Sequence, residues 1–163
     1  MIRAAVAATL AACALAVPAR AQDPVPAVQP AAPGISLLGP VLEVSDIAGA
    51  LAFYTDGLGL TLAMQMGAPN RREYMLRFSP DPAAAGLILI HDGTVARRVP
   101  ITHPPGFDRL VLRVADIDAL AARLDARKIA HTPIRDVAMG YRMMLVTDTE
   151  GYKLELVQSA PRR

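Results

Sequence analysis

The stretch Val41-Leu42-Glu43-Val44-Ser45-Asp46-Ile47 decides the fold, because the chain repeats it as VLRVADI at 111–117. Five of the seven residues are identical, and the second copy begins 70 positions after the first. In both copies a β-rich run leads to an Asp, and apolar residues at helical spacing follow. We therefore expect an internal duplication in which Asp46 and Asp116 each cap the N-terminus of a helix.

Three further strands are expected after each helix. In the first copy they cover 61–66, 73–78 and 87–91, and in the second copy 131–137, 141–147 and 152–158. Gly57 is expected to end the first helix in a left-handed conformation. The order of elements predicts an α+β domain made of two tandem βαβββ modules.

Length and composition indicate one domain. The chain has 163 residues, of which 53% are hydrophobic, and this combination excludes a disordered chain. We place the domain at 35–160, with module 1 at 35–92, a connector at 93–106 and module 2 at 107–158. Residues 22–34 contain four prolines and no apolar period, which is typical of an extended linker.

The first 21 residues have the layout of a secretory signal peptide. Arg3 precedes an apolar stretch at 4–17, and Ala19-Arg20-Ala21 supplies the small residues of a cleavage site. The apolar stretch is too short to span a hydrocarbon core of roughly 30 Å. We predict cleavage after Ala21 and a periplasmic or secreted protein without a membrane span. Leu10-Ala11-Ala12-Cys13 resembles a lipoprotein box, so a lipid anchor at Cys13 is one alternative and a retained apolar anchor is another.

Loss of the signal peptide would change the charge balance. It would remove Arg3 and Arg20 and leave 15 basic and 15 acidic residues. The basic pI of the full sequence therefore gives no reason to expect a nucleic-acid partner. Cys13 is the only cysteine, so the mature chain would have neither disulfides nor thiolate metal sites.

Two further motifs connect the duplication with a known family. FYTDGLGL at 53–60 resembles the FYxxxLGL signature of the vicinal oxygen chelate superfamily, which includes glyoxalase I, extradiol dioxygenases and bleomycin-resistance proteins. DTEGYKLEL at 148–156 resembles the closing DPxGxxxEL strand of that family. With the repeat, the resemblance covers 35–158. It implies the glyoxalase/bleomycin resistance/dihydroxybiphenyl dioxygenase fold, in which tandem modules form a cup-shaped mixed sheet.

The resemblance also identifies four positions where metal-dependent members hold a divalent ion. Here they are Gly39, Ile88, Arg109 and Glu155, and only Glu155 offers a ligand atom that a cation accepts. Catalytic sites of this kind need about three protein ligands. We therefore expect no metal and no cofactor, and we do not predict glyoxalase I or extradiol dioxygenase activity. Gly39 is expected to leave open space where a ligand side chain would stand.

The resemblance implies that Arg109 and Glu155 face the cup, and strand alternation then predicts that Glu43 and Arg113 face it too, among aliphatic side chains. Arg142, on the next-to-last strand, is a further candidate for ligand binding. Two interpretations stay open. The charges form internal ion pairs, Glu43 with Arg113 and Arg109 with Glu155, and do nothing else. Alternatively, an arginine binds a carboxylate, enolate or phosphate through paired hydrogen bonds.

Three functions are compatible with these residues. The first is metal-independent binding of a small molecule in the cup of an exported protein, with an anionic ligand matching the arginines. The second is a metal-free lyase or isomerase, in which Glu155 removes a proton beside a carbonyl group and Arg109 stabilises the oxyanion. The third is a structural or interaction role as a homodimer formed along exposed sheet edges. Whether the protein is an enzyme stays open at this stage.

Overall fold

The computed structural model describes residues 36–94 and 106–160. The predicted signal peptide (1–21) and linker (22–34) lie outside the described residues, as does most of the predicted connector. The described parts contain both copies of the repeat and every candidate site residue named above.

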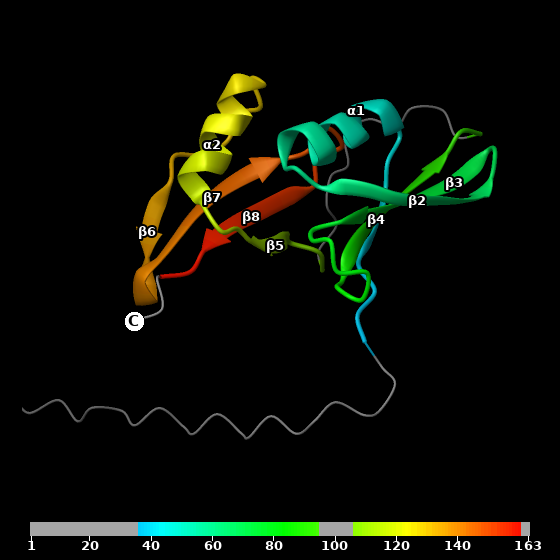
Figure 1. Cartoon of the computed structure of the whole chain (residues 1–163). Helices are drawn as coiled ribbons and strands as arrows, with labels where there is room; N and C mark the ends of the chain where they lie inside the picture. Colours follow the sequence, from blue (N-terminus) through cyan, green and yellow to red (C-terminus); the bar gives the residue numbers. More distant parts are fainter. Residues whose placement is uncertain (1–35, 95–105, 161–163) are drawn as a thin grey trace, which may run out of the picture. The chain divides into compact units, whose positions relative to one another are not determined.

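The two halves of the domain have the same order of α-helix and strands, and they differ in where a short helical turn is inserted (Figure 1). The first half consists of β1 (Val41–Glu43), α1 (Ile47–Ala52), the π-helical turn η1 (Phe53–Gly57), β2 (Thr61–Ala68), β3 (Arg71–Arg77) and β4 (Gly86–Asp92). The second half consists of β5 (Leu110–Arg113), α2 (Ile117–Ala126), β6 (Arg135–Val137), the 3₁₀ turn η2 (Ala138–Gly140), β7 (Tyr141–Thr147) and β8 (Lys153–Gln158). The predicted α+β fold of tandem βαβββ modules is confirmed.

Each half builds its own four-stranded mixed sheet. The strand order is β1-β4-β3-β2 in the first sheet and β5-β8-β7-β6 in the second. The first strand of each half pairs in parallel with the last strand of that half, and the other pairs are antiparallel. The two central strands of each sheet are thus the last two strands of its module.

Both helices begin where the repeat predicts. The side chain of Asp46 accepts a hydrogen bond of 3.0 Å from the backbone N–H of Gly49, and Asp116 accepts one of 2.9 Å from Ala119. In each case the carboxylate satisfies an N–H group of the first turn that has no partner within the helix. The cap therefore follows from local sequence alone.

The end of the first helix differs from the expectation. Gly57 is not left-handed, because the helix widens into the turn η1 and the positive φ of +84° occurs two residues later, at Gly59. Gly57 instead permits close packing against the second half, since a Cβ built there would lie 2.8 Å from Cδ1 of Ile129. A larger residue at this position would have to displace the end of the Ile129 side chain, which is distant in sequence.

The expected strand at 131–137 is the one that the structure shortens most. Only Arg135–Val137 pairs with β7 as a strand, while His131 makes an isolated bridge with Val146. Pro133 lies between these two segments and has no N–H group to donate to a ladder. The other expected strands are present, with ends shifted by a few residues.

One hydrophobic core is shared by the two halves. Strand alternation directs one side of each sheet toward this core, as in Leu42 and Val44 of the first half and Leu154 and Leu156 of the second. The opposite side of each sheet carries exposed residues such as Val41 and Val111. We call that opposite side the open face of the sheet. No helix within the described residues is long and apolar enough to cross a membrane.

Candidate functional site

The open face of the second sheet carries three of the predicted site residues. In the parallel pair of β5 and β8, Val111 lies beside Glu155 and Arg113 lies beside Val157. Residues that face each other in a ladder point to the same side of the sheet. Arg113 and Glu155 therefore lie on one side, together with Val111 and Val157. Leu145 of β7 pairs with Glu155 and lies on the same side.

The open face of the first sheet is more apolar. Val41 pairs with Ile88, and Glu43 pairs with Ile90. The registers of the neighbouring strands extend this side with Met75, Glu73, Met64 and Met66. Glu43 thus lies on an open face, as predicted, but on a different sheet from Arg113 and Glu155.

Arg109 and Glu155 form an ion pair, one of the two pairs that the sequence allows. Nε of Arg109 donates to a carboxylate oxygen of Glu155, and a second nitrogen of Arg109 contacts Asp108. The hydrogen bond to Glu155 and the charge of Asp108 raise the pKa of the Arg109 guanidinium above its usual value. The pair engages one oxygen of Glu155, so a general base at this position would have to act through the other oxygen.

Arg113 behaves differently. It is exposed, and it makes no hydrogen bond or ion pair with any residue in 36–94 or 106–160, so the second anticipated pair, with Glu43, is not formed there. Its neighbours on the open face, Val111 and Val157, are apolar. A guanidinium beside apolar surface is a group that can hold an anion by paired hydrogen bonds.

Arg142 is separated from these residues. It lies opposite Gln158 in the ladder of β7 and β8, whereas Glu155 lies opposite Leu145, so the two side chains project from opposite sides of the sheet. Arg142 holds Asp118 of α2 by two hydrogen bonds of 2.5 and 2.9 Å. These bonds lower the pKa of Asp118. Arg142 therefore fastens α2 to its sheet and does not belong to the group on the open face.

The four positions that hold a metal in the resembling family do not fit one here. Gly39 and Ile88 have no side-chain donor atom and the guanidinium of Arg109 is cationic, so Glu155 alone could coordinate a cation, and it is paired with Arg109. The expectation of open space at Gly39 is wrong, because a Cβ built there would lie 2.3 Å from the backbone oxygen of Gly86. The glycine allows the two chain segments to approach closely. Within 36–94 and 106–160, no three His, Cys, Asp or Glu side chains gather as a possible metal site.

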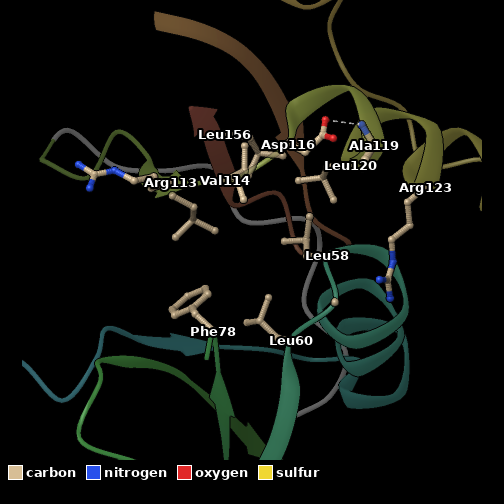
Figure 2. A pocket seen from close by; sticks show the side chains of 13 residues that line it. Leu58, Leu60, Phe78, Arg113, Val114, Asp116, Ala119, Leu120, Arg123 and Leu156 are labelled. Atoms are coloured by element: carbon tan, nitrogen blue, oxygen red, sulfur yellow. Dashed lines mark hydrogen bonds between the residues drawn. The ribbon is translucent and has the colours of Figure 1, made fainter. Parts of the chain in front are cut away.

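A cavity of about 430 Å³ lies where the two halves meet, and no local sequence pattern predicts it. Figure 2 shows Leu58, Leu60 and Phe78 of the first half on one side and Val114, Leu120 and Leu156 of the second half on the other. The start of α2 forms part of the wall, and the side chain of Arg113 points away from it. We call this the junction cavity.

The contact between the halves also contains the two buried acids of the described residues. Glu150 accepts hydrogen bonds of 2.9 and 2.8 Å from the backbone N–H groups of Ser45 and Asp46, and the hydroxyl of Ser45 donates to it as well. Asp148 accepts a bond of 2.8 Å from the hydroxyl of Tyr54. The acidic turn at 148–151 was recognised in the sequence, but nothing local indicated its partners 94 to 105 residues away.

Burial controls the protonation of the second of these pairs. Desolvation raises the pKa of Asp148, although hydrogen bonds from Tyr54 and from the backbone of Tyr152 and Glu150 oppose the shift. Burial and the nearby charge of Asp148 raise the pKa of Tyr54 far above its usual value, so its hydroxyl stays a hydrogen-bond donor. The pair is a structural contact between η1 and the turn that precedes β8.

With this geometry in place, the comparisons with known proteins can be interpreted. The model of the glyoxalase/bleomycin resistance protein/dioxygenase superfamily matches residues 37–156. The chain belongs to this superfamily. The match spans both modules, in agreement with the resemblance carried by the motifs at 53–60 and 148–156. None of the curated proteins compared with the chain matches it in sequence.

Solved structures of the superfamily share the fold. A trypanothione-dependent glyoxalase I of Leishmania major is 23% identical, with a TM-score of 0.62 over 76% of this chain and 86% of that one. A glyoxalase-family protein of Enterococcus faecalis is 21% identical, with a TM-score of 0.60 over 75% and 96%. TnmS3, an antibiotic-binding protein from a Streptomyces species, is 25% identical, with a TM-score of 0.58 over 78% and 98%. The relatives thus include both an enzyme and a binding protein.

Proposed function

We propose that the protein is exported and binds a small anionic molecule without a metal ion. The ligand would lie in the cup that the resemblance implies, on the open face of the second sheet. Export rests on the signal-peptide layout of the first 21 residues. Metal independence rests on the donor set at Gly39, Ile88, Arg109 and Glu155, which offers a cation one carboxylate that is already ion-paired. The antibiotic-binding relative supports a binding role in this superfamily.

The observation that carries the anionic ligand is the state of Arg113. Its guanidinium is exposed beside Val111 and Val157 and has no partner among the described residues, whereas Arg109 and Arg142 are both ion-paired. Apolar surface would take the body of a ligand, and the guanidinium would take its carboxylate or phosphate. Val111 is exposed on the same strand and the same side of the sheet as Arg113, and it supplies such apolar surface.

Benzoate and phenyl phosphate are suitable probes for this site. We expect each to raise the thermal unfolding temperature of the protein in a saturable way, and we expect Arg113→Ala to abolish the effect. Arg142→Ala is the matched control, because it removes an arginine from the opposite side of the same sheet. An equal loss in both variants, or no saturable effect in the unmodified protein, would contradict the proposal. Elemental analysis of the purified protein should find no stoichiometric transition metal.

A homodimer is the second candidate, and the composition of the open faces favours it. These faces carry large exposed apolar side chains, including Val41, Met64, Met66 and Val111, and exposed apolar patches often mark interaction sites. The charges differ between the sheets: the first open face carries Glu43, Glu73 and Asp92 together with Arg71 and Arg77, whereas the second carries Arg113, Arg135 and Lys153 beside the Arg109–Glu155 pair. The first sheet of one copy would therefore complement the second sheet of another.

Light scattering tests this second candidate. We expect the mass of a dimer for the unmodified protein and the mass of a monomer for Met64→Glu, because a new charge on the open face would have to be buried without a partner. Ala122→Glu, on the exposed side of α2, is the control and should leave the mass unchanged. A monomer at every protein concentration in the unmodified protein would exclude the dimer.

A further inference from the structure

The junction cavity lies where the two halves should make equivalent contacts but do not. The spacing of 70 residues relates 111–117 to 41–47, and it also relates β7 to β3, which end at Thr147 and Arg77. By the same spacing, Asp148 corresponds to Phe78, and Glu150 corresponds to Pro80. The two contacts between a helix start and the turn of the other half can therefore be compared residue by residue.

In one contact, a carboxylate occupies the start of the helix. Glu150 accepts hydrogen bonds from the N–H groups of Ser45 and Asp46, directly before α1, and it is 4% exposed. The side chain of Asp46 caps Gly49 at the same time. The backbone at this point of the repeat thus accommodates an incoming carboxylate in addition to the capping aspartate.

In the other contact, no carboxylate is present. The corresponding residue is Pro80, which has no acceptor in its side chain, and the nearest acid, Asp81, accepts a hydrogen bond from Ala83 in its own turn. The backbone N–H groups of Ala115 and Asp116, which correspond to those of Ser45 and Asp46, donate to no described acceptor. Both residues line the junction cavity.

Most of the remaining wall of the cavity is apolar. Phe78 is 44% exposed there, whereas its counterpart Asp148 is buried, and Leu58, Leu60 and Leu120 complete the walls that Figure 2 shows. A volume of about 430 Å³ is within the range of roughly 300–1,000 Å³ that is usual for small-molecule pockets. The cavity therefore combines apolar walls with two backbone donors at one end.

Charged groups around the cavity are compatible with an anion. Asp118 is the acid nearest in sequence to the start of α2, apart from the capping residue Asp116, and its charge is paired with Arg142 by two hydrogen bonds. Arg123 also lines the cavity and donates to the backbone oxygen of Asp56 at 2.8 Å. Arg123 belongs to the last turn of α2, so its guanidinium adds a positive charge to the wall of the cavity and not to the start of the helix.

We propose that the junction cavity binds a small apolar molecule with one carboxylate, such as a medium-chain fatty acid. The carboxylate accepts hydrogen bonds from the N–H groups of Ala115 and Asp116, in the place that Glu150 takes in the other half. The hydrocarbon chain lies between Leu60, Phe78 and Leu120. This site is separate from the open faces, because Leu112, Val114 and Leu156 contribute the opposite side of the second sheet to it.

Octanoate is the probe, and 1-octanol is its neutral counterpart. We expect saturable binding of octanoate by calorimetry, with amide chemical-shift changes at Ala115 and Asp116 in NMR spectra of the full mature chain. Octanol should bind at least about tenfold more weakly than octanoate, because it lacks the charge that strengthens both hydrogen bonds. Equal affinity for the two probes would refute the carboxylate subsite.

Two variants on the same helix locate the site. Ala119 lines the cavity and Ala122 does not, and both are exposed on α2, so Ala119→Phe should fill the cavity while Ala122→Phe should not. We expect a loss of octanoate affinity of about tenfold or more for the first and less than about twofold for the second. Arg109→Ala, on the open face, should leave octanoate binding unchanged. Binding that survives Ala119→Phe, or the absence of saturable binding, would overturn the inference without affecting the site at Arg113.

Discussion

The two halves of this domain share one plan but differ where they meet. At the start of α1, Glu150 of the second half closes the contact, and Tyr54 with Asp148 extends it into the core. At the start of α2, Pro80 and Phe78 stand at the corresponding positions, and the junction cavity results. The backbone order of the duplicated unit persists because local sequence maintains it, whereas the contacts between the copies are free to diverge.

The open faces diverge in the same way. In the repeat, Arg113 corresponds to Glu43 and Arg109 corresponds to Gly39. In the ladders, Ile88 lies beside Val41 in the first sheet, and Glu155 lies beside Val111 in the second. The first half therefore presents an apolar surface that carries both acids and arginines, and the second presents a surface with an excess of basic side chains. Duplication has supplied two similar scaffolds for two chemically different faces.

The largest expected effect comes from exchanging the residues at the repeat position that is occupied by Gly39 in the first half and by Arg109 in the second. Gly39→Arg should lower the free energy of unfolding by about 3 kcal/mol or more, because its Cβ would collide with the backbone oxygen of Gly86. Arg109→Gly should change the unfolding temperature only slightly, since an exposed ion pair contributes little. Thermal and urea unfolding of both variants measure the difference. Comparable losses would show that the two halves are not distinguished by close packing at this position.

The next effect concerns the contact at the start of α1. Glu150→Ala should lower the free energy of unfolding by about 2–4 kcal/mol, because two backbone donors and a hydroxyl lose a buried acceptor. At the start of α2, Gln158→Ala removes a single hydrogen bond from the N–H of Ile117 and should cost about 1 kcal/mol. Urea unfolding at neutral pH compares them. A cost for Glu150→Ala no greater than that for Gln158→Ala would argue against its role as the main contact between the halves.

A pH-dependent effect separates the buried acid of this contact from an exposed one. Burial raises the pKa of Asp148, so the folded chain takes up this proton at a higher pH than the unfolded chain does. The stability contributed by Asp148 should therefore increase as the pH falls from neutral toward the ordinary aspartate pKa of about 3.9. Urea unfolding of the unmodified chain and of Asp148→Asn between pH 7 and about pH 4.5 should show a growing advantage for the aspartate.

Asp118 is the control for that experiment. Hydrogen bonds from Arg142 lower its pKa, so its contribution should stay constant above the unfolded pKa and decline only as the pH falls below about 4. The difference between the unmodified chain and Asp118→Asn should thus be flat over the range in which that of Asp148→Asn changes. Parallel pH profiles for the two variants would contradict the assignment of the shift to burial.

The smallest effect is expected for the arginine without a partner. Arg113→Ala should change the free energy of unfolding by no more than about 0.5 kcal/mol, because no described hydrogen bond is lost. Arg142→Ala should lower the unfolding temperature more, since it releases Asp118 from two hydrogen bonds. A strong loss of stability for Arg113→Ala would mean that its guanidinium serves the fold and is not available to a ligand.

Much of the fold was predictable because its signals are local. Asp46 and Asp116 cap helices through N–H groups three residues away, and the strands of the second half end close to where alternation places them. The site was less predictable. Arg142 and Glu155 were assigned to one group, and only the register of β7 with β8 shows that they project from opposite sides of the sheet.

By itself, the sequence determined the duplicated βαβββ order, the helix starts and the superfamily, because hydrophobic periodicity and capping act over a few residues. The tertiary structure decided which charges meet. Glu150 reaches Ser45 across 105 positions, Gly39 touches Gly86, and Phe78 is left beside an unfilled cavity. Such contacts depend on how two complete modules pack, and no short stretch of either module carries that information.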